Sequence, residues 1–442
     1  RVKEVLRVNP WIAGVVKPLS KAPKQAKRHI LNNPAFKGKI GKSLLVFRKT
    51  IADNDIDDEV DSILIIEEKI DPHLKRSSTY GQLAKACQKD SRVVPNRSGL
   101  YKSGQRVTKI TLVPISDDEF CVVFAMSHVI ADGDTYFKIM TMLSTKTNGN
   151  NADFLFNIDE LDPNRQFDYR EIEQAAIGMK EWEFMSSLKF VKMMIQGLMA
   201  KPKKDSSTLN CPGPEEPSGL RIRANFIDKA KVDAQKQMYK ERLNATADAT
   251  TNLFEKKIEK VEFISTQDII TSSWFNASSS MLPMFTFNLR ERCPKLSKNL
   301  AGNYETSMVQ DPPSYANASL IRKSLLPNEE CFTRANPMPL PGFCGKTSCA
   351  FITTWCFSVD EKAAGLYLQG CQQLLHMPIM PVSILKMCPM DFAVVFNANI
   401  DNIDDSSGQS RQAILMFCKE ATDDVLMNNP ASVLGDVVSV GA

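Results

Sequence analysis

The sequence lacks most of the features that mark specialised classes of protein. None of its 442 residues belongs to an apolar run long enough to cross a bilayer, so we expect no transmembrane segment. The formal net charge is only +4 and is spread along the chain, so it argues neither for nor against nucleic acid, and we expect none as a partner. Histidine is scarce, and none of the four histidines has a second ligand at metal-binding spacing, so we expect no metal site.

Cysteine is present but lacks the spacing of a metal site or a redox motif. Of the eleven cysteines, the closest pairs are Cys344/Cys349 and Cys349/Cys356, and neither has the two-residue gap of such motifs. Irregularly spaced thiols are typical of a reduced intracellular protein, so we expect a cytoplasmic location. The chain opens on Arg1 without a leader, and we expect that its native start is missing, in which case a targeting peptide could have been lost.

What is present is the composition of an ordinary soluble globular protein, with 43% hydrophobic and 24% charged residues. A chain of this length favours two subdomains over one core. Residues 201–220 are rich in Pro, Lys, Ser and Glu without periodicity, which is typical of a linker. We therefore expect an N-terminal subdomain at 1–200 and a C-terminal subdomain at 221–442. The oligomeric state is not predicted.

Hydrophobic periodicity predicts alternating helices and strands in both halves. In the first half we expect a helix at Val2–Val8, strands at Trp11–Val16, Ser43–Phe47 and Ser62–Ile66, a hairpin of Arg106–Pro114 and Glu119–Met126, and a helix at Asp134–Ser144 capped by Asp132 or Asp134. In the second half we expect a helix at Asn225–Lys240, a helix that Ser265 or Thr266 caps and that runs to Trp274, strands at Met284–Leu289, Ser348–Phe357, Val382–Met387 and Phe392–Asn397, and a loop at 399–410.

Residues 175–200 form a helix-rich, Met-rich segment with two interpretations. One is a surface that touches apolar substrate or lipid, which would add peripheral contact with a membrane. The other, which we favour, is a helix packed on the first subdomain.

One histidine stands out by its surroundings. His128 directly follows the apolar strand 119–126, and the string Ser127–Gly133 places Asp132 and Gly133 four and five residues after the histidine. A strand end fixes such a side chain and the adjoining turn exposes it. A neutral imidazole is abundant at pH 7 and can accept a proton from an attacking hydroxyl, so we interpret His128 as a general base.

Three short motifs follow one another along the chain, and the first of them contains His128. They are the His-x-x-x-Asp-Gly string at 128–133, the Ser-Thr-Gln-Asp helix at 265–274 that closes on Trp, and the Arg-Glu-Arg strand at 287–294 that leads to Gly302-Asn303. A Pro-x-x-Ala-Gly turn at 10–14 precedes them. Together they resemble the chloramphenicol-acetyltransferase-like superfamily, which includes BAHD acyltransferases and the condensation domains of peptide synthetases.

The resemblance implies an α/β fold of two chloramphenicol-acetyltransferase-like subdomains. Each would be a mixed β-sheet flanked by helices, with an active-site channel between them. The implied activity is that of an acyl-CoA-dependent O- or N-acyltransferase, with His128 as general base. Acyl-CoA would be the co-substrate and a small molecule with a hydroxyl or amine the acceptor, and no metal or covalent acyl-enzyme would be required.

Further residues follow from this chemistry. Attack on a thioester leaves an oxyanion that needs a donor, and Thr353, Thr354 and the Trp355 indole are the candidates, although ordinary strand threonines are an equal alternative. We expect Asp132 to pair with the buried cation Arg290 and so to brace the loop, and Gly133 to allow a tight backbone. Asp132→Asn should then lose activity through misplacement of His128.

Two departures from the superfamily pattern leave an alternative open. The superfamily's Asp-Phe-Gly-Trp-Gly is only half present, as Asp391–Val395, and Ser127 stands where a first histidine is common. The alternative is a catalytically inactive member that serves as a binding or structural subunit of a larger assembly. A condensation-type domain that takes acyl groups from a carrier protein is a third interpretation.

Overall fold

The structure is a computed structural model of the chain. It describes residues 1–18, 43–48, 50–74, 78–95, 105–145, 156–163, 169–188, 190, 220–248, 261–328, 331–335, 337–338, 348–356, 366–373, 375–380, 390–398, 412–429 and 432–438. Within these ranges, no helix combines the length and the apolar character that crossing a bilayer requires.

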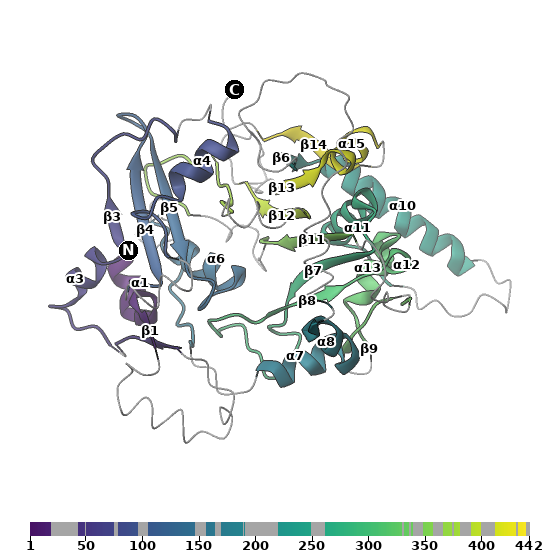
Figure 1. The fold of residues 1–442 in the computed structure, drawn as a ribbon, viewed down its shortest axis with the longest axis horizontal. Helices are drawn as coiled ribbons and strands as arrows, with labels where there is room; N and C mark the ends of the chain where they lie inside the picture. The colour runs from purple at the N-terminus through teal and green to yellow at the C-terminus, as the bar shows by residue number, and fades with distance from the viewer. Residues whose placement is uncertain are drawn as a thin grey trace.

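The larger of the two main sheets belongs to the second half of the chain (Figure 1). In the described part of the protein it has seven strands, in the order β14 (Leu434–Val437), β6 (Leu220–Ile227), β13 (Gln412–Lys419), β12 (Asp391–Asn397), β11 (Cys349–Thr354), β7 (Leu282–Asn288) and β8 (Glu305–Val309). The central strands β12, β11 and β7 are parallel to one another, whereas β8, β13, β6 and β14 join in antiparallel pairs. We call it the large sheet.

The small sheet belongs to the first half and has three strands among the described residues. Its order is β3 (Leu64–Ile66), β4 (Thr108–Pro114) and β5 (Phe120–Met126), with β3 parallel and β5 antiparallel to β4. Helices α1 (Val2–Val8), α3 (Ile56–Asp61), α4 (Tyr80–Cys87) and α6 (Gly133–Met142) accompany it. Both main sheets are therefore mixed and flanked by helices, which confirms the predicted α/β class.

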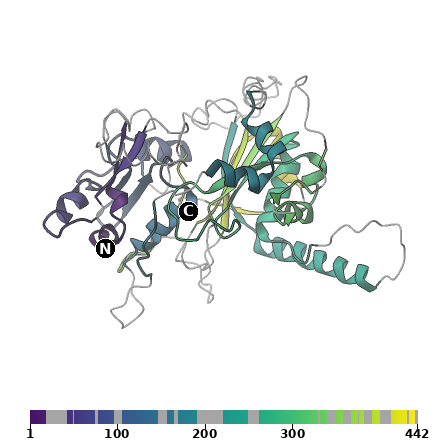
Figure 2. The ribbon, with the colours of Figure 1, turned by 90° about the horizontal axis from the view of Figure 1, so that it is seen from below.

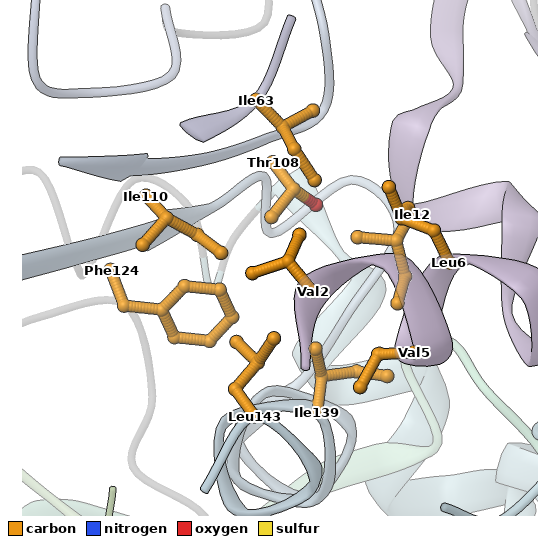
Figure 3. Close-up of a pocket in the computed structure, with 10 residues that line it drawn as sticks. All are labelled: Val2, Val5, Leu6, Ile12, Ile63, Thr108, Ile110, Phe124, Ile139 and Leu143. Carbon is orange, nitrogen blue, oxygen red and sulfur yellow. The ribbon is translucent and has the colours of Figure 1, made fainter. Parts of the chain in front are cut away.

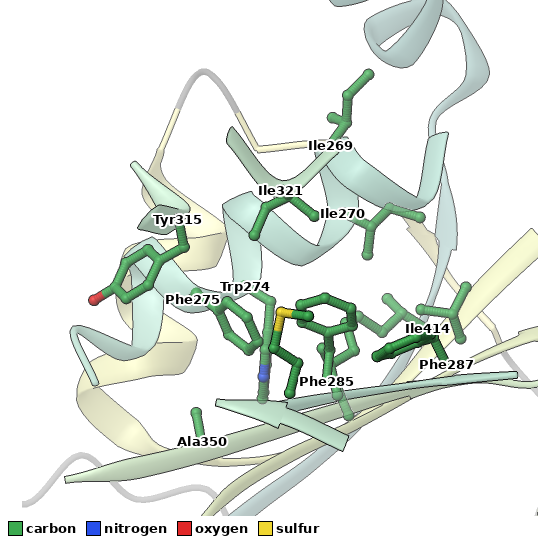
Figure 4. Packing of buried hydrophobic residues seen from close by; sticks show 14 of the residues in the cluster. Ile269, Ile270, Trp274, Phe275, Phe285, Phe287, Tyr315, Ile321, Ala350 and Ile414 are labelled. Carbon is green, nitrogen blue, oxygen red and sulfur yellow. The ribbon is translucent and has the colours of Figure 1, made fainter. Parts of the chain in front are cut away.

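Helix α11 (Thr266–Ser278) covers one face of the large sheet. Ser265 accepts from the Asp268 backbone N–H and the Asp268 side chain accepts from the Ser265 N–H, so the predicted cap is present as a reciprocal box. Figure 4 shows how the apolar residues of this helix meet those of the strands. The buried members include Ile270, Trp274, Phe275, Phe285, Phe287, Ala350 and Ile414. Helices α13 (Ala318–Ser324) and α15 (Glu420–Asn428) pack beside α11.

The opposite face of the large sheet joins the two halves. Tyr80 of α4 lies edge-on to Phe417 of β13, with ring centres 5.5 Å apart, and Phe137 of α6 lies edge-on to Trp355. Residues 366–380, which follow the large sheet's β11 in sequence, also reach α4, because the Met380 N–H donates to the Tyr80 hydroxyl. Figure 2, turned by 90° from Figure 1, shows the two groups of elements side by side, with the long helix α10 (Lys229–Asp248) extending away from them.

A cavity lies inside the first half, away from the join. Apolar side chains of α1, the small sheet and α6 line it, together with Thr108 (Figure 3). No charged side chain belongs to the described lining, so this cavity is part of a packed core and not a site for chemistry.

Several predicted elements need correction. Trp11–Val16 is not one strand: a 3-10 turn, η1 (Pro10–Ala13), comes first because Pro10 presets a helical φ, and strand β1 (Val15–Pro18) follows. The helix expected at Asn225–Lys240 begins later, since Asn225 belongs to β6. The predicted strand Val382–Met387 and the predicted loop 399–410 lie outside the described residues, as do 201–219 of the predicted linker.

The segment before the linker packs differently from our expectation. Helix α7 (Tyr169–Ile177) places Ile172, Ala176 and Ile177 in the core beneath α11, and α8 (Met179–Ser186) follows it. The expected packing of residues 175–200 on the first subdomain was therefore wrong for the described part. The boundary at 200 stays a prediction, and the packing of α7 favours an earlier one.

Candidate active site

The turn after β5 presents His128 to solvent. The strand ends at Met126, and a backbone bond from the Ile130 N–H to the Ser127 carbonyl closes a turn around the histidine. The His128 side chain is 73% exposed, although the flanking Ser127 and Ile130 are buried. The strand end therefore holds the backbone of this histidine while leaving its ring available to a ligand.

Asn303 fixes the orientation of the imidazole. Its side-chain Nδ2 donates to the His128 carbonyl, and its Oδ1 lies 3.1 Å from the ring Nδ1. A carbonyl can only accept, so the amide must present its oxygen to Nδ1. That oxygen requires a proton on Nδ1, which leaves the Nε2 lone pair free. The ring is thus held in the tautomer that a base acting through Nε2 needs.

Glu305 is the acidic neighbour of this nitrogen. Its Oε1 lies 3.5 Å from Nε2, which is longer than a hydrogen bond of roughly 2.7–3.2 Å. Burial raises the pKa of Glu305 above its ordinary value and the Asp132 carboxylate raises it further, whereas His128 and Arg290 act in the opposite direction. Nε2 is therefore close to a carboxyl group without being occupied by it.

Asp132 and Arg290 form the predicted ion pair beneath the turn. Arg290 Nη1 lies 2.7 Å from Asp132 Oδ2 and Nη2 lies 3.2 Å from Oδ1, so the contact is bidentate. Each side chain is only 2% exposed. Asp132 also caps α6 by accepting from the Thr135 N–H, and it accepts from the Tyr304 N–H. The predicted contact is confirmed by this geometry.

Thr135 and Gly302 complete this buried network. The Gly302 carbonyl accepts from the Asp132 N–H, from Thr135 Oγ1 and from Arg290 Nη2. Gly302 has φ of 142°, and a Cβ there would lie 3.0 Å from the Tyr304 ring, so glycine is required at this position. Gly133 is the first residue of α6 and has no positive φ, so the tight backbone that we expected at Gly133 is found at Gly302. The network ties the His128 turn to the loop that carries Asn303.

The candidate oxyanion donors lie at the end of β11, two strands from Glu305. Ile352 pairs with Phe285 and both face α11, so Thr353 faces the opposite side and Thr354 faces α11. Thr353 thus shares a face with Glu305, and β7 separates the two strands by about 10 Å in total. Trp355 packs edge-on to Phe137. No hydrogen bond joins these three residues to His128 in the described part of the chain.

The sequence did not single out two residues that contact the imidazole. Asn303 entered only as part of a Gly-Asn motif, and Glu305 did not enter at all. Asn303 carried only the weak signal of its motif, because it lies 175 residues from His128 and the motif does not say which residue it contacts. Glu305 carried no such signal, since its contact with His128 forms only when β8 pairs with β7.

No metal or channel is defined at this site by the residues described. The described side chains include no group of three His, Cys, Asp or Glu residues positioned to hold a metal ion. The His128 ring is open to solvent and not sealed in an interior. The channel between the halves stays a prediction.

Comparison with known proteins gives the following findings. No family model matches the sequence, and neither does any curated protein. Among solved structures, the chain is similar to TRI101 of F. graminearum in complex with coenzyme A and T-2 mycotoxin, at 14% identity and a TM-score of 0.48, over 100% of this chain and 90% of that one. TRI101 of F. sporotrichioides, with coenzyme A and T-2, gives 13% identity, a TM-score of 0.45 and the same two coverages.

A condensation domain is also similar. The first condensation domain of the CDA synthetase gives 8% identity and a TM-score of 0.42, over 99% of this chain and 88% of that one. At these identities the likeness concerns the fold alone.

Proposed function

We propose that the protein is an acyltransferase that moves an acyl group from acyl-CoA to a hydroxyl or amine acceptor. The observation that carries this proposal is the state of His128. Its imidazole is exposed, Asn303 Oδ1 accepts from Nδ1, and Nε2 makes no hydrogen bond within the described residues, with Glu305 Oε1 3.5 Å away. The acyl-CoA donor follows from the motif resemblance. A cytoplasmic location and a small-molecule acceptor belong to the same proposal.

In the proposed reaction, His128 Nε2 accepts the proton that the acceptor loses as it attacks the thioester carbonyl. The Asn303 amide stabilises the imidazolium, since Nδ1–H continues to donate to Oδ1. Nε2 then returns the proton to the departing thiolate. The Asp132–Arg290 pair positions the turn and takes no proton in this scheme.

Thr353 is the proposed oxyanion donor, because it shares with Glu305 the face of the large sheet opposite α11. Thr354 faces α11, which leaves it unsuited to that role. Trp355 is proposed to support the join between the halves through Phe137.

The test is thiol release from acetyl-CoA and longer acyl-CoAs, with mixtures of alcohols and amines, by the wild type and by His128→Ala. Loss of a general base should lower the rate by about 10²- to 10⁴-fold. His73→Ala is the matched control, because that histidine is exposed and lies in a separate loop. Wild-type rates in His128→Ala contradict the proposal. A folded wild type that releases no thiol from any donor favours the alternative, a catalytically inactive binding or structural subunit.

A further inference from the structure

Glu305 stands at the first position of β8, directly across the sheet from Asn288. The side chains of Thr306 and Met308, one and three residues after Glu305, are buried. Met308 belongs to the core that α11 covers. Alternation along the strand therefore turns the Glu305 side chain to the other face, where it meets His128. The side chain is 23% exposed, so it is largely desolvated but still reachable.

Among the described residues, the two aspartates of the site are each paired with a permanent cation, whereas Glu305 is not. Arg290 neutralises Asp132, and Lys138 Nζ lies 2.7 Å from Asp134 Oδ2. Among the described residues, the ion pair that Glu305 makes is with His128, which carries charge only when protonated. While the imidazole is neutral and serves as a base, the Glu305 carboxylate is a largely buried anion that forms no ion pair with a permanent cation among the described residues, although Arg290 attracts it without contact. Such a group is stabilised by a cation that enters from solvent.

The spacing of the two acceptor atoms suits a nitrogen with several protons. Nε2 and Oε1 are 3.5 Å apart, so one ligand atom can lie about 2.9 Å from both. An alkylammonium group carries three N–H bonds and can donate to both atoms at once. A hydroxyl has a single proton and can donate to only one of them.

We propose that Glu305 makes this site selective for primary amines, which bind as alkylammonium ions, and that Glu305 and His128 act on the same nitrogen. This inference rests on the proposed acyl transfer. The Glu305 carboxylate takes one proton from the ammonium, leaving a neutral amine that can attack the thioester carbonyl. The second N–H proton passes to His128 Nε2 as the C–N bond forms, and from there to the thiolate as the C–S bond breaks. The products are an amide and a free thiol, and Glu305 releases its proton to solvent.

The electrostatics of the site agree with this role. Burial and the Asp132 carboxylate both raise the pKa of Glu305, which makes its carboxylate a stronger base than an exposed glutamate. The charged and titratable groups around it are His128 after β5, Asp132 before α6 and Arg290 after β7, and the Tyr169 hydroxyl of α7 donates to the Glu305 carbonyl.

The experiment compares two acceptors that differ only in the nucleophile, hexylamine and hexanol, with 2-phenylethylamine and 2-phenylethanol as a second pair. Acetyl-CoA is the donor, and kcat/KM is measured by thiol release with product mass as confirmation. The variants are Glu305→Gln, His128→Ala and Glu291→Gln. Glu291→Gln is the matched control. Glu291 is exposed and lies next to Arg290, and its replacement removes the same formal charge as Glu305→Gln.

Wild type should prefer each amine to its alcohol. Glu305→Gln should lower kcat/KM for the amine by about 10- to 100-fold, through both KM and kcat, because the variant neither pairs with the ammonium nor takes its proton, and it should change kcat/KM for the alcohol by less than about twofold. Glu291→Gln should change neither. As the pH is lowered, the rate of the wild type with an amine acceptor should fall with the protonation of two groups, and the rate of Glu305→Gln with the protonation of one. A purely structural role of Glu305 would not change the pH profile in this way.

Two other outcomes separate the two proposals. Turnover that depends on His128 but prefers alcohols, or that Glu305→Gln lowers equally for both acceptors, overturns the role of Glu305 and leaves acyl transfer in place. Absence of thiol release by wild type with all four acceptors overturns the acyl-transfer proposal and the amine proposal together.

Discussion

The two parts of the site differ sharply in burial. The anchor, which we define as Asp132, Thr135, Arg290 and Gly302, lies beneath the surface, and the charged side chains of its ion pair are 2% exposed. The reactive edge, which we define as His128, Asn303 and Glu305, lies above it, with the His128 side chain 73% exposed. Both parts come from the same two segments, 128–135 and 290–305. In the first segment the exposed side chain of His128 and the buried side chain of Asp132 are only four residues apart.

The two parts also differ in how their polar atoms are used. Asp132 accepts from Arg290, from two backbone N–H groups and from no solvent-facing donor that the described residues show. In the part of the chain that the structure describes, Nε2 of His128 faces the Glu305 carboxyl group, whose Oε1 lies 3.5 Å away. A saturated buried network holds a backbone rigidly, while an unsaturated exposed atom can exchange one partner for a substrate. Rigidity and reactivity are therefore supplied by different residues.

Removing the cation from the anchor should produce the largest effect. Arg290→Met leaves the Asp132 carboxylate buried without a partner, which should lower the free energy of unfolding by about 3–5 kcal/mol. The double variant Asp132→Asn with Arg290→Met removes both charges and should recover part of that loss. Urea denaturation measures both, with His128→Ala expected to stay near the wild type. A loss below about 1 kcal/mol in Arg290→Met contradicts the anchor role.

Asp132→Asn addresses the same part through activity. The amide keeps the size of the carboxylate but weakens the bidentate contact, so His128 should be misplaced and the rate should fall. Wild-type turnover in this variant would show that the turn does not need the ion pair.

Adjacent threonines on β11 offer a sharper comparison on activity alone. Thr353→Val should lower kcat by about 10²- to 10³-fold if its hydroxyl donates to the oxyanion. Thr354→Val should change kcat by less than about twofold, because Thr354 faces α11 on the other side of the sheet. Both replacements keep the β-branched shape. Thr354→Val also removes the acceptor of the Cys356 N–H, so of the two variants it should be the less stable in urea. Equal losses in the two variants contradict the assignment of the faces.

These comparisons show which parts of the site the sequence could predict. The Asp132–Arg290 pair was predictable, since a carboxylate buried four residues after His128 needs a cation and Arg290 lies in one of the other motifs. The α11 cap at Ser265 was predictable for a similar reason, because cap chemistry is local. Local patterns and sequence motifs thus anticipated the ion pair of the anchor, but not Thr135 or Gly302.

The reactive edge depends on contacts that no local pattern encodes. His128 and Asn303 are 175 residues apart, and their contact forms only through the network that joins the two halves. Thr353 and Thr354 cannot be told apart until strand register is known, because a shift of one residue exchanges their faces. Strand β13 was missed despite its buried run Ala413–Cys418, since a continuous apolar stretch does not show the period of a strand.

Asn303 offers a smaller effect that concerns the tautomer. Asn303→Leu removes the acceptor that faces Nδ1 and should lower kcat by about 3- to 10-fold, because the ring can then place its proton on Nε2. Asn303→Asp keeps an acceptor toward Nδ1 and should recover most of the rate, although it loses the donor to the His128 carbonyl. The ¹⁵N chemical shifts of the His128 ring measure the tautomer directly. An unchanged Nδ1–H tautomer in Asn303→Leu contradicts this account.

The smallest expected effect is the pH dependence of stability that Glu305 contributes. Burial raises the pKa of Glu305 in the folded state, so the folded state holds this proton more tightly than the unfolded state does. The resulting contribution to the free energy of unfolding is fully present below the ordinary pKa near 4.5, and it is lost as the pH rises through the folded-state pKa. Glu305→Gln does not titrate and keeps that stability. The unfolding free energy of the variant relative to the wild type should therefore increase from pH 4 to pH 8. A constant or falling difference would mean that the carboxylate already has a permanent cationic partner, and the site would then offer no unpaired charge to an alkylammonium ligand.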